Sequence, residues 1–226
     1  IEVDLPIKRI SAHARREKSI RHGHISTLHI WWARRPLAAC RAVICAALWA
    51  DPADERCPAA FRALARERMQ QWATQHIGLS GEESYKRFIR AQKNPKLFDD
   101  ATELRNALLD FIADFANWDN STRAEYLATA RTLTSVAHLA LTRDAEFLQA
   151  YAAYQHDHSI ENLKSKIKNS SRPLVVDPFA GGGAIPLEAL RVGADAFASD
   201  LNPVAVLLNK VVLEYIPKYG QQLADE

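Results

Sequence analysis

A glycine-rich turn between a short strand and a helix most limits the folds open to this chain. The run Pro173–Asp177 is rich in β-formers and ends in an acid, and Gly181–Gly183 follow directly. A helix is expected from about Ala184 to Val192, then a second short strand over Asp195–Asp200 and a helix over Val204–Tyr215. This alternation of strand and helix predicts an α/β fold with a parallel sheet and right-handed crossovers.

The glycine turn favours one class of ligand over two others. A nucleoside triphosphate loop needs a lysine after the last glycine, and none is present. A dinucleotide site needs a third glycine for close helix packing, where this chain has Pro186. S-adenosylmethionine is cationic and has no phosphate, so an acid at the strand end suits it, and Asp177 stands there. Asp200 follows 23 residues later, at the spacing expected of an acid that binds ribose hydroxyls.

Two motifs in this region resemble those of amino-methylating DNA methyltransferases. The segment Asp177–Gly183 is similar to the first cofactor motif, Asp-Pro-Phe-x-Gly-x-Gly, and Ser199–Pro203 resembles the second, whose acid binds ribose. In that family the apolar residue after the acid, here Leu201, lies against adenine. The resemblance implies the start of a Rossmann-like S-adenosylmethionine-dependent fold. The cofactor-binding residues that it implies are Asp177, Pro178, Phe179, Ala180, Gly181, Gly183, Asp200, Leu201 and Asn202.

The N-terminal part is basic and resembles a second family segment. Nine Lys/Arg and one acid between Lys8 and Arg41 give this stretch a charge of +8, and the remainder carries −6. The runs 15–24 and 31–37 resemble the DUF1156 region, which begins a family of adenine-specific DNA methylases, some of them linked to anti-phage defence. The resemblance implies that Trp32 lies near the methionine end of the cofactor and that Arg34 or Arg35 pairs with the cofactor carboxylate. Contact of the arginines with DNA phosphates is an equal alternative.

Between the two motif-bearing parts the sequence predicts helices. The chain divides into a basic segment (1–50), a large helical insertion (51–170) and the first βαβα part of the methyltransferase domain (171–226). Within the first part, Leu37–Trp49 is apolar on nearly every side and must be buried. The insertion caps the sheet or recognises DNA or a partner. Its expected helices are Pro58–His76, Glu82–Gln92, Lys96–Trp118, Thr122–Thr142 and Asp144–Tyr154. Residues 156–172 are expected to form a polar connection, and Pro217 is expected to end the last helix of the chain.

The chain lacks the catalytic loop of the enzymes that it resembles. That loop has two adjacent prolines, and no two prolines are adjacent here. We therefore expect the loop beyond Glu226, no catalytic residue in this chain, and an inactive fragment. The activity expected of the whole protein is N6-methylation of an adenine flipped from double-stranded DNA. An RNA methyltransferase, or a non-catalytic module within a defence complex, are the alternatives.

Three further features of the sequence bear on metal binding, the cellular setting and membrane insertion. The spacing of His22, His24 and His29 matches no zinc pattern, so no metal site is expected. The three cysteines form no Cys-x-x-Cys pair, which favours a reducing, cytoplasmic setting. The longest apolar run, Ala42–Ala50, is too short to span a membrane.

Overall fold

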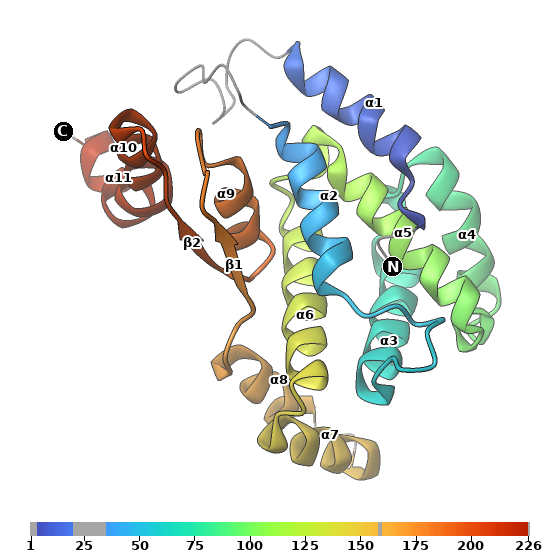
Figure 1. Ribbon diagram of the computed structural model, residues 1–226. Coiled ribbons are helices and arrows are strands. Elements are labelled where there is room, and N and C mark those ends of the chain that lie inside the picture. The colour runs from blue at the N-terminus through green and yellow to red at the C-terminus, as the bar shows by residue number, and fades with distance from the viewer. Residues whose placement is uncertain (1–3, 20–34, 158–159, 226) are drawn as a thin grey trace.

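The structure is mainly helical, with a small parallel sheet in the C-terminal part of the chain (Figure 1). It is a computed structural model, and it describes residues 4–19, 35–157 and 160–225. The helices before the sheet are α1 (Ile7–Lys18), α2 (Leu37–Leu48), α3 (Ala59–Gln75), α4 (Glu82–Lys93), α5 (Ala101–Ala116), α6 (Ala124–Leu141), α7 (Ala145–Asp157) and α8 (Ile160–Asn169). The sheet region comprises β1 (Leu174–Asp177), α9 (Ala184–Arg191), β2 (Asp195–Ala198), α10 (Pro203–Lys210) and α11 (Ile216–Asp225).

The helical core is built around α3, α5 and α6. Apolar side chains recur along α5 at helical spacing, and Leu104, Leu108 and Phe111 are all fully buried. The ring centroid of Trp72 on α3 lies 4.9 Å from that of Phe111 and 4.5 Å from that of Tyr126 on α6. Aromatic pairs at these distances contribute beyond the area that they bury. The helical periodicity of the sequence is thereby confirmed for the middle of the chain.

One predicted helix is divided in the structure. A single helix was expected over Lys96–Trp118, but a 3₁₀ turn at Leu97–Asp99 is followed by a new start at Ala101. The cause is Asp100, whose carboxylate accepts the backbone N–H groups of the second and third residues of α5 at 2.8 and 2.9 Å. An N-cap acid of this kind fixes a helix start.

Two C-terminal segments are more helical than expected. Residues 156–172 were expected to form a polar connection, yet 160–169 form α8, which buries Leu163 beneath it. Pro217 was expected to end the last helix, yet α11 continues through it. A π-helical turn over Val211–Tyr215 ends two residues before the proline. Its altered hydrogen-bond pattern tolerates a residue that has no N–H.

The sheet consists of two parallel strands joined by α9. β1 pairs with β2 in the register Leu174↔Asp195 to Asp177↔Ala198, so the prediction of a parallel strand–helix–strand unit is confirmed. Figure 1 shows α9 between the sheet and α2. Leu174, Val176 and Phe197 point away from α9 and are 56–61% exposed. Among the described residues, that second face of the sheet is uncovered.

A buried ion pair joins α2 to α9. Arg41 is 1% exposed and donates to both carboxylate oxygens of Glu188, at 2.7 and 3.1 Å. It also donates to the carbonyl oxygen of Phe115 at 2.5 Å. Arg191 donates to Glu188 at 3.1 Å and to the carbonyl oxygen of Ser121 at 3.0 Å. The N-terminal segment, the helical middle and the sheet region are thus connected through one charged cluster.

Helix α1 is fixed by charged contacts to the rest of the N-terminal and middle parts. Arg9 donates to Asp110 and Asp114 on α5, at 2.7 Å in both cases. The carboxylate of Glu17 accepts the backbone N–H groups of the first two residues of α2, at 3.0 and 2.9 Å. Glu17 therefore caps α2 although it lies on another helix. No helix among the described residues combines the length and apolar character of a membrane span.

Candidate functional site

The glycine turn lies at the carboxyl edge of the sheet, between β1 and α9. Gly181 and Gly183 have positive φ angles of 51° and 78°, which residues with a Cβ rarely adopt. The backbone N–H of Ala180 donates to the carbonyl oxygen of Ser199 at 3.0 Å, and that of Gly183 donates to the carbonyl of Ala180 at 2.8 Å. The turn is therefore tied to the end of β2 and leads directly into the N-terminus of α9.

Asp177 ends β1 and begins this turn. Its side chain is 7% exposed, and one carboxylate oxygen accepts the backbone N–H of Phe179 at 3.1 Å. Its backbone carbonyl accepts the N–H of Ser199 at 3.0 Å. Pro178, between them, is exposed. The acid expected at the strand end thus stands at the base of the turn.

Asp200 connects the two sequence motifs. One carboxylate oxygen accepts the N–H of Gly181 at 2.8 Å, and the other accepts the N–H of Asn202 at 2.9 Å. Donation by the backbone N–H groups of Asn202, Gly181 and Leu201 lowers the pKa of the Asp200 carboxyl below its usual value. The carboxylate is therefore ionised at neutral pH. Asn202 in turn caps α10, because its side-chain oxygen accepts the N–H of Val204 at 2.9 Å.

Asn209 belongs to the same arrangement, although the sequence analysis missed it. Its Nδ2 donates to the carbonyl oxygen of Gly181 at 3.0 Å and to that of Ala205 at 2.8 Å. Its Oδ1 is buried and has no hydrogen-bond partner. A Cβ added to Gly183 would stand 2.7 Å from that oxygen. The sequence feature that could have indicated this role is the amide side chain of Asn209 directly after the apolar run of α10.

Two apolar side chains flank the turn and are open to solvent. Phe179 is 74% exposed and Leu201 is 95% exposed. Exposed large apolar side chains beside a backbone turn are a common feature of ligand sites. The predicted residues from both motifs are thus gathered at one edge of the sheet.

The remaining candidates do not join this cluster in the described part of the chain. Trp32 and Arg34, and the three histidines considered for a metal, lie outside the described residues. Arg35 is described, and it borders a recess of about 410 Å³ between α2, β1 and α9. That recess is apolar, with Val43 and Val175 in its lining. Across the described residues, no group of three or more His, Cys, Asp or Glu is placed to hold a metal.

Two family models match this chain, one at each end. Residues 4–73 match the model described as protein of unknown function (DUF1156). Residues 157–224 match the model of D12 class N6 adenine-specific DNA methyltransferases. The two stretches are called the DUF1156 segment and the D12-class segment below, after the models to which they are similar. The D12-class segment contains the glycine turn, and the DUF1156 segment contains α1 and α2. No curated protein and no solved structure matches the chain.

Proposed function

We propose that this chain is the cofactor-binding front portion of an S-adenosylmethionine-dependent methyltransferase that acts on N6 of adenine in double-stranded DNA. The observation that carries the proposal is the carboxylate of Asp200, which accepts an N–H from each motif, at Gly181 and at Asn202. The match to D12-class enzymes supports DNA as the substrate. The strand–helix–strand unit and its two acids support a Rossmann-like arrangement.

The residues present fit the chemistry of this cofactor. Asp177 and Asp200 provide two carboxylates at one sheet edge, suited to a cationic amino-acid end and to ribose hydroxyls. Both oxygens of Asp200 keep a second lone pair beyond the backbone contact that each makes. The exposed Phe179 and Leu201 offer apolar surface for an adenine ring. The positive φ of Gly181 and Gly183 brings backbone rather than side chain against the ligand.

Within this proposal the chain binds and orients the cofactor, and it does not itself catalyse methyl transfer. The bound cofactor supplies an electrophilic methyl group on sulfur. Asp200 and Leu201 hold the nucleoside end, and Asp177, with Pro178 and Ala180, shapes the turn beneath the methionine end. Trp32 and Arg34 are proposed to close that end. The proline-rich loop that orients the adenine amine is expected outside these 226 residues, so this chain alone is expected to be inactive.

A non-catalytic role is the second candidate. It is favoured by one observation, the absence of adjacent prolines from the 226 residues. The chain would then be an interaction module of a cytoplasmic complex, in keeping with the link between DUF1156 and anti-phage defence. An RNA substrate is a variant of the first candidate, because the proposed cofactor residues do not distinguish the two nucleic acids.

Calorimetric titration with S-adenosylmethionine tests the proposal. Removing a charged hydrogen-bond acceptor in Asp200→Ala costs about 1.5–3 kcal/mol, so we expect affinity to fall on the order of ten- to a hundredfold. The matched control is Asp195→Ala, which removes an exposed acid from the opposite end of β2 and is expected to bind like the wild type. Equal affinity for both variants and the wild type would contradict the assignment of Asp200.

A further inference from the structure

A recess with a strongly positive lining lies at the opposite end of α9 from the glycine turn. It has a volume of about 560 Å³. Its lining includes Leu190, in the last turn of α9, and Gly193, in the turn that leads into β2. An eight-residue helix rises about 12 Å, so this recess is separate from the candidate cofactor site. It is bordered by α3, α6, α8 and Arg172, which lies two residues before the start of β1. Its cationic side chains are Arg68, Arg131, Lys164, Lys168 and Arg172.

These cations are only weakly compensated. The lining contains no carboxylate. Among the described residues, Lys164 and Lys168 have no acid within ion-pair distance, and the single acid near Arg172 is Asp195, at 3.9 Å and exposed. Cations that line the same recess repel one another unless an anion lies between them. The recess therefore has the electrostatics of an anion site.

Two of the cations are held in place by contacts that leave donors available. Arg131 donates through Nε to the carbonyl oxygen of Arg191, at 3.0 Å, and its stem packs at the position of Gly193. Arg68 donates through Nη1 to Gln71 at 2.8 Å. Burial lowers the pKa of the Arg68 guanidinium, and the nearby Glu67 opposes this shift. Planar guanidinium groups fixed in this way match phosphate oxygens well.

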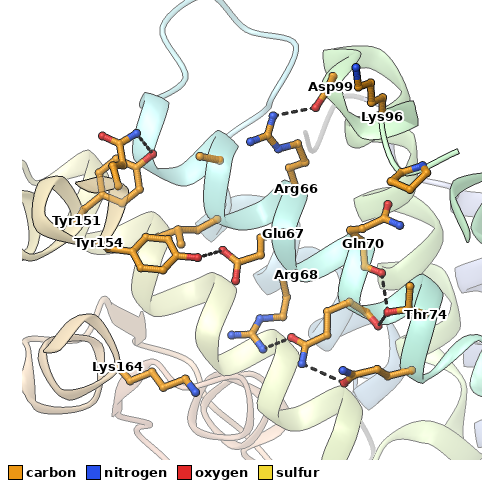
Figure 2. A pocket seen from close by; sticks show the side chains of 16 residues that line it. Arg66, Glu67, Arg68, Gln70, Thr74, Lys96, Asp99, Tyr151, Tyr154 and Lys164 are labelled. Carbon is orange, nitrogen blue, oxygen red and sulfur yellow. Dashed lines mark hydrogen bonds and ion pairs between the residues drawn. The ribbon is translucent and has the colours of Figure 1, made fainter. Parts of the chain in front are cut away.

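The positive surface continues into a second, larger recess. The two share Arg68 and Lys164, and the second has a volume of about 870 Å³. Figure 2 shows its side chains, with Arg66 paired to Asp99 and Tyr154 donating to Glu67. Asp99 is thus paired with a cation, whereas Glu67 keeps its charge, because its partner is a neutral hydroxyl. The result is an elongated concave surface with spaced cations, a shape suited to a chain of phosphates rather than to a flat membrane.

We propose that this surface, formed by the two adjoining recesses, binds the phosphate backbone of a nucleic acid. The binding is separate from recognition of the target base and goes beyond the proposed methyl transfer. It gives the helical middle of the chain a function, since α3, α6 and α8 supply most of the cations. Contacts to phosphate position a duplex and carry no sequence information, so binding here is expected to be insensitive to base sequence.

The test measures binding of a fluorescein-labelled 20-base-pair duplex by anisotropy across a range of salt concentrations. For B-DNA the slope of log K against log salt falls by about 0.9 for each phosphate-neutralising cation that is lost. Removing two cations in Lys164→Gln/Lys168→Gln should therefore lower the slope by about 1.8, with affinity at low salt falling at least tenfold. The matched control, Lys86→Gln/Lys93→Gln, removes the same charge from the exposed lysines of α4 and should change neither quantity.

Each other outcome overturns the proposal. Equal losses in both double variants would show general charge attraction, and no loss in either would show that the duplex lies elsewhere. Inorganic phosphate serves as a second probe. If it binds the wild type but not Lys164→Gln/Lys168→Gln, while both bind DNA equally well, the recess is a pocket for a small anion. Titration of S-adenosylmethionine into Lys164→Gln/Lys168→Gln separates this test from the proposed function, because the affinity of this variant for the cofactor should equal that of the wild type.

Discussion

Replacing one partner of the Arg41–Glu188 pair should destabilise the folded chain strongly. In Glu188→Gln the guanidinium of Arg41, which is 1% exposed, keeps its hydrogen bond to the carbonyl of Phe115 but loses its counter-charge. Leaving one charge of a buried pair uncompensated costs about 3–5 kcal/mol. In a chain of this length, 1 kcal/mol shifts Tm by about 2–4 °C, so we expect a decrease on the order of 10 °C.

The double variant Arg41→Met/Glu188→Leu should recover much of that loss. Apolar residues of similar volume often replace a buried pair at little cost, because the two desolvation penalties disappear together. Arg191 keeps the carbonyl of Ser121 as a partner in this variant. Completing the double-mutant cycle, Arg41→Met and Glu188→Leu alone are each expected to lower Tm, and the sum of their two losses should exceed the loss in the double variant.

The assay is thermal unfolding followed by far-UV circular dichroism at neutral pH. Arg56→Met is the control, since Arg56 is 90% exposed and its pair with Asp54 should leave Tm unchanged. If Glu188→Gln and the control shift Tm equally, the pair is not buried as described. If the double variant is as unstable as the sum of the singles, desolvation of the pair is not the dominant energy.

Two further experiments test the glycine turn, one with substitutions and one by measuring a pKa. Gly183→Ala places a Cβ at a φ of 78° and 2.7 Å from Oδ1 of Asn209, so it should weaken cofactor binding and lower Tm; adding Asn209→Ala should recover part of the Tm loss. The pKa of Asp200, followed by NMR of its carboxyl carbon, should lie below the ordinary value of 3.8, because backbone N–H groups bind the ionised form. Stability linked to the Asp200 carboxylate should be fully present above its pKa in the unfolded chain and lost as pH falls through its pKa in the folded chain. A measured pKa at or above 3.8 would contradict the backbone contacts of Asp200.

Local signals predicted the sheet region well. Asp177 ends β1, and the parallel register agrees with the expected order. The second strand is shorter than expected, because β2 ends at Ala198 and Asp200 lies in the turn beyond it. The buried helix α2 was also predicted from its apolar composition, since Arg41 is its single charge and Glu188 neutralises it. These features depend on residues close in sequence or on a strong apolar pattern.

Long-range contacts account for most of what the sequence analysis missed. Asn209 reaches a carbonyl 28 residues earlier, and Glu17 caps a helix that starts 20 residues later. The division at Asp100 depends on a side-chain cap that competes with a continuous apolar pattern. Helix α8 is polar by composition and forms because Leu163 finds a buried position against the helical core. The Asp100 cap is local, since its donors Thr102 and Glu103 lie two and three residues away, but the other partners lie outside a local window.

The uncovered face of the sheet makes the folding energetics of this chain depend on its surroundings. Leu174, Val176 and Phe197 lie side by side on two short strands, and parallel sheets are usually covered on both faces. Any polypeptide that binds this face binds only the folded form, so it stabilises the fold by mass action. Apparent stability of the isolated chain should therefore rise with the concentration of whatever covers these side chains.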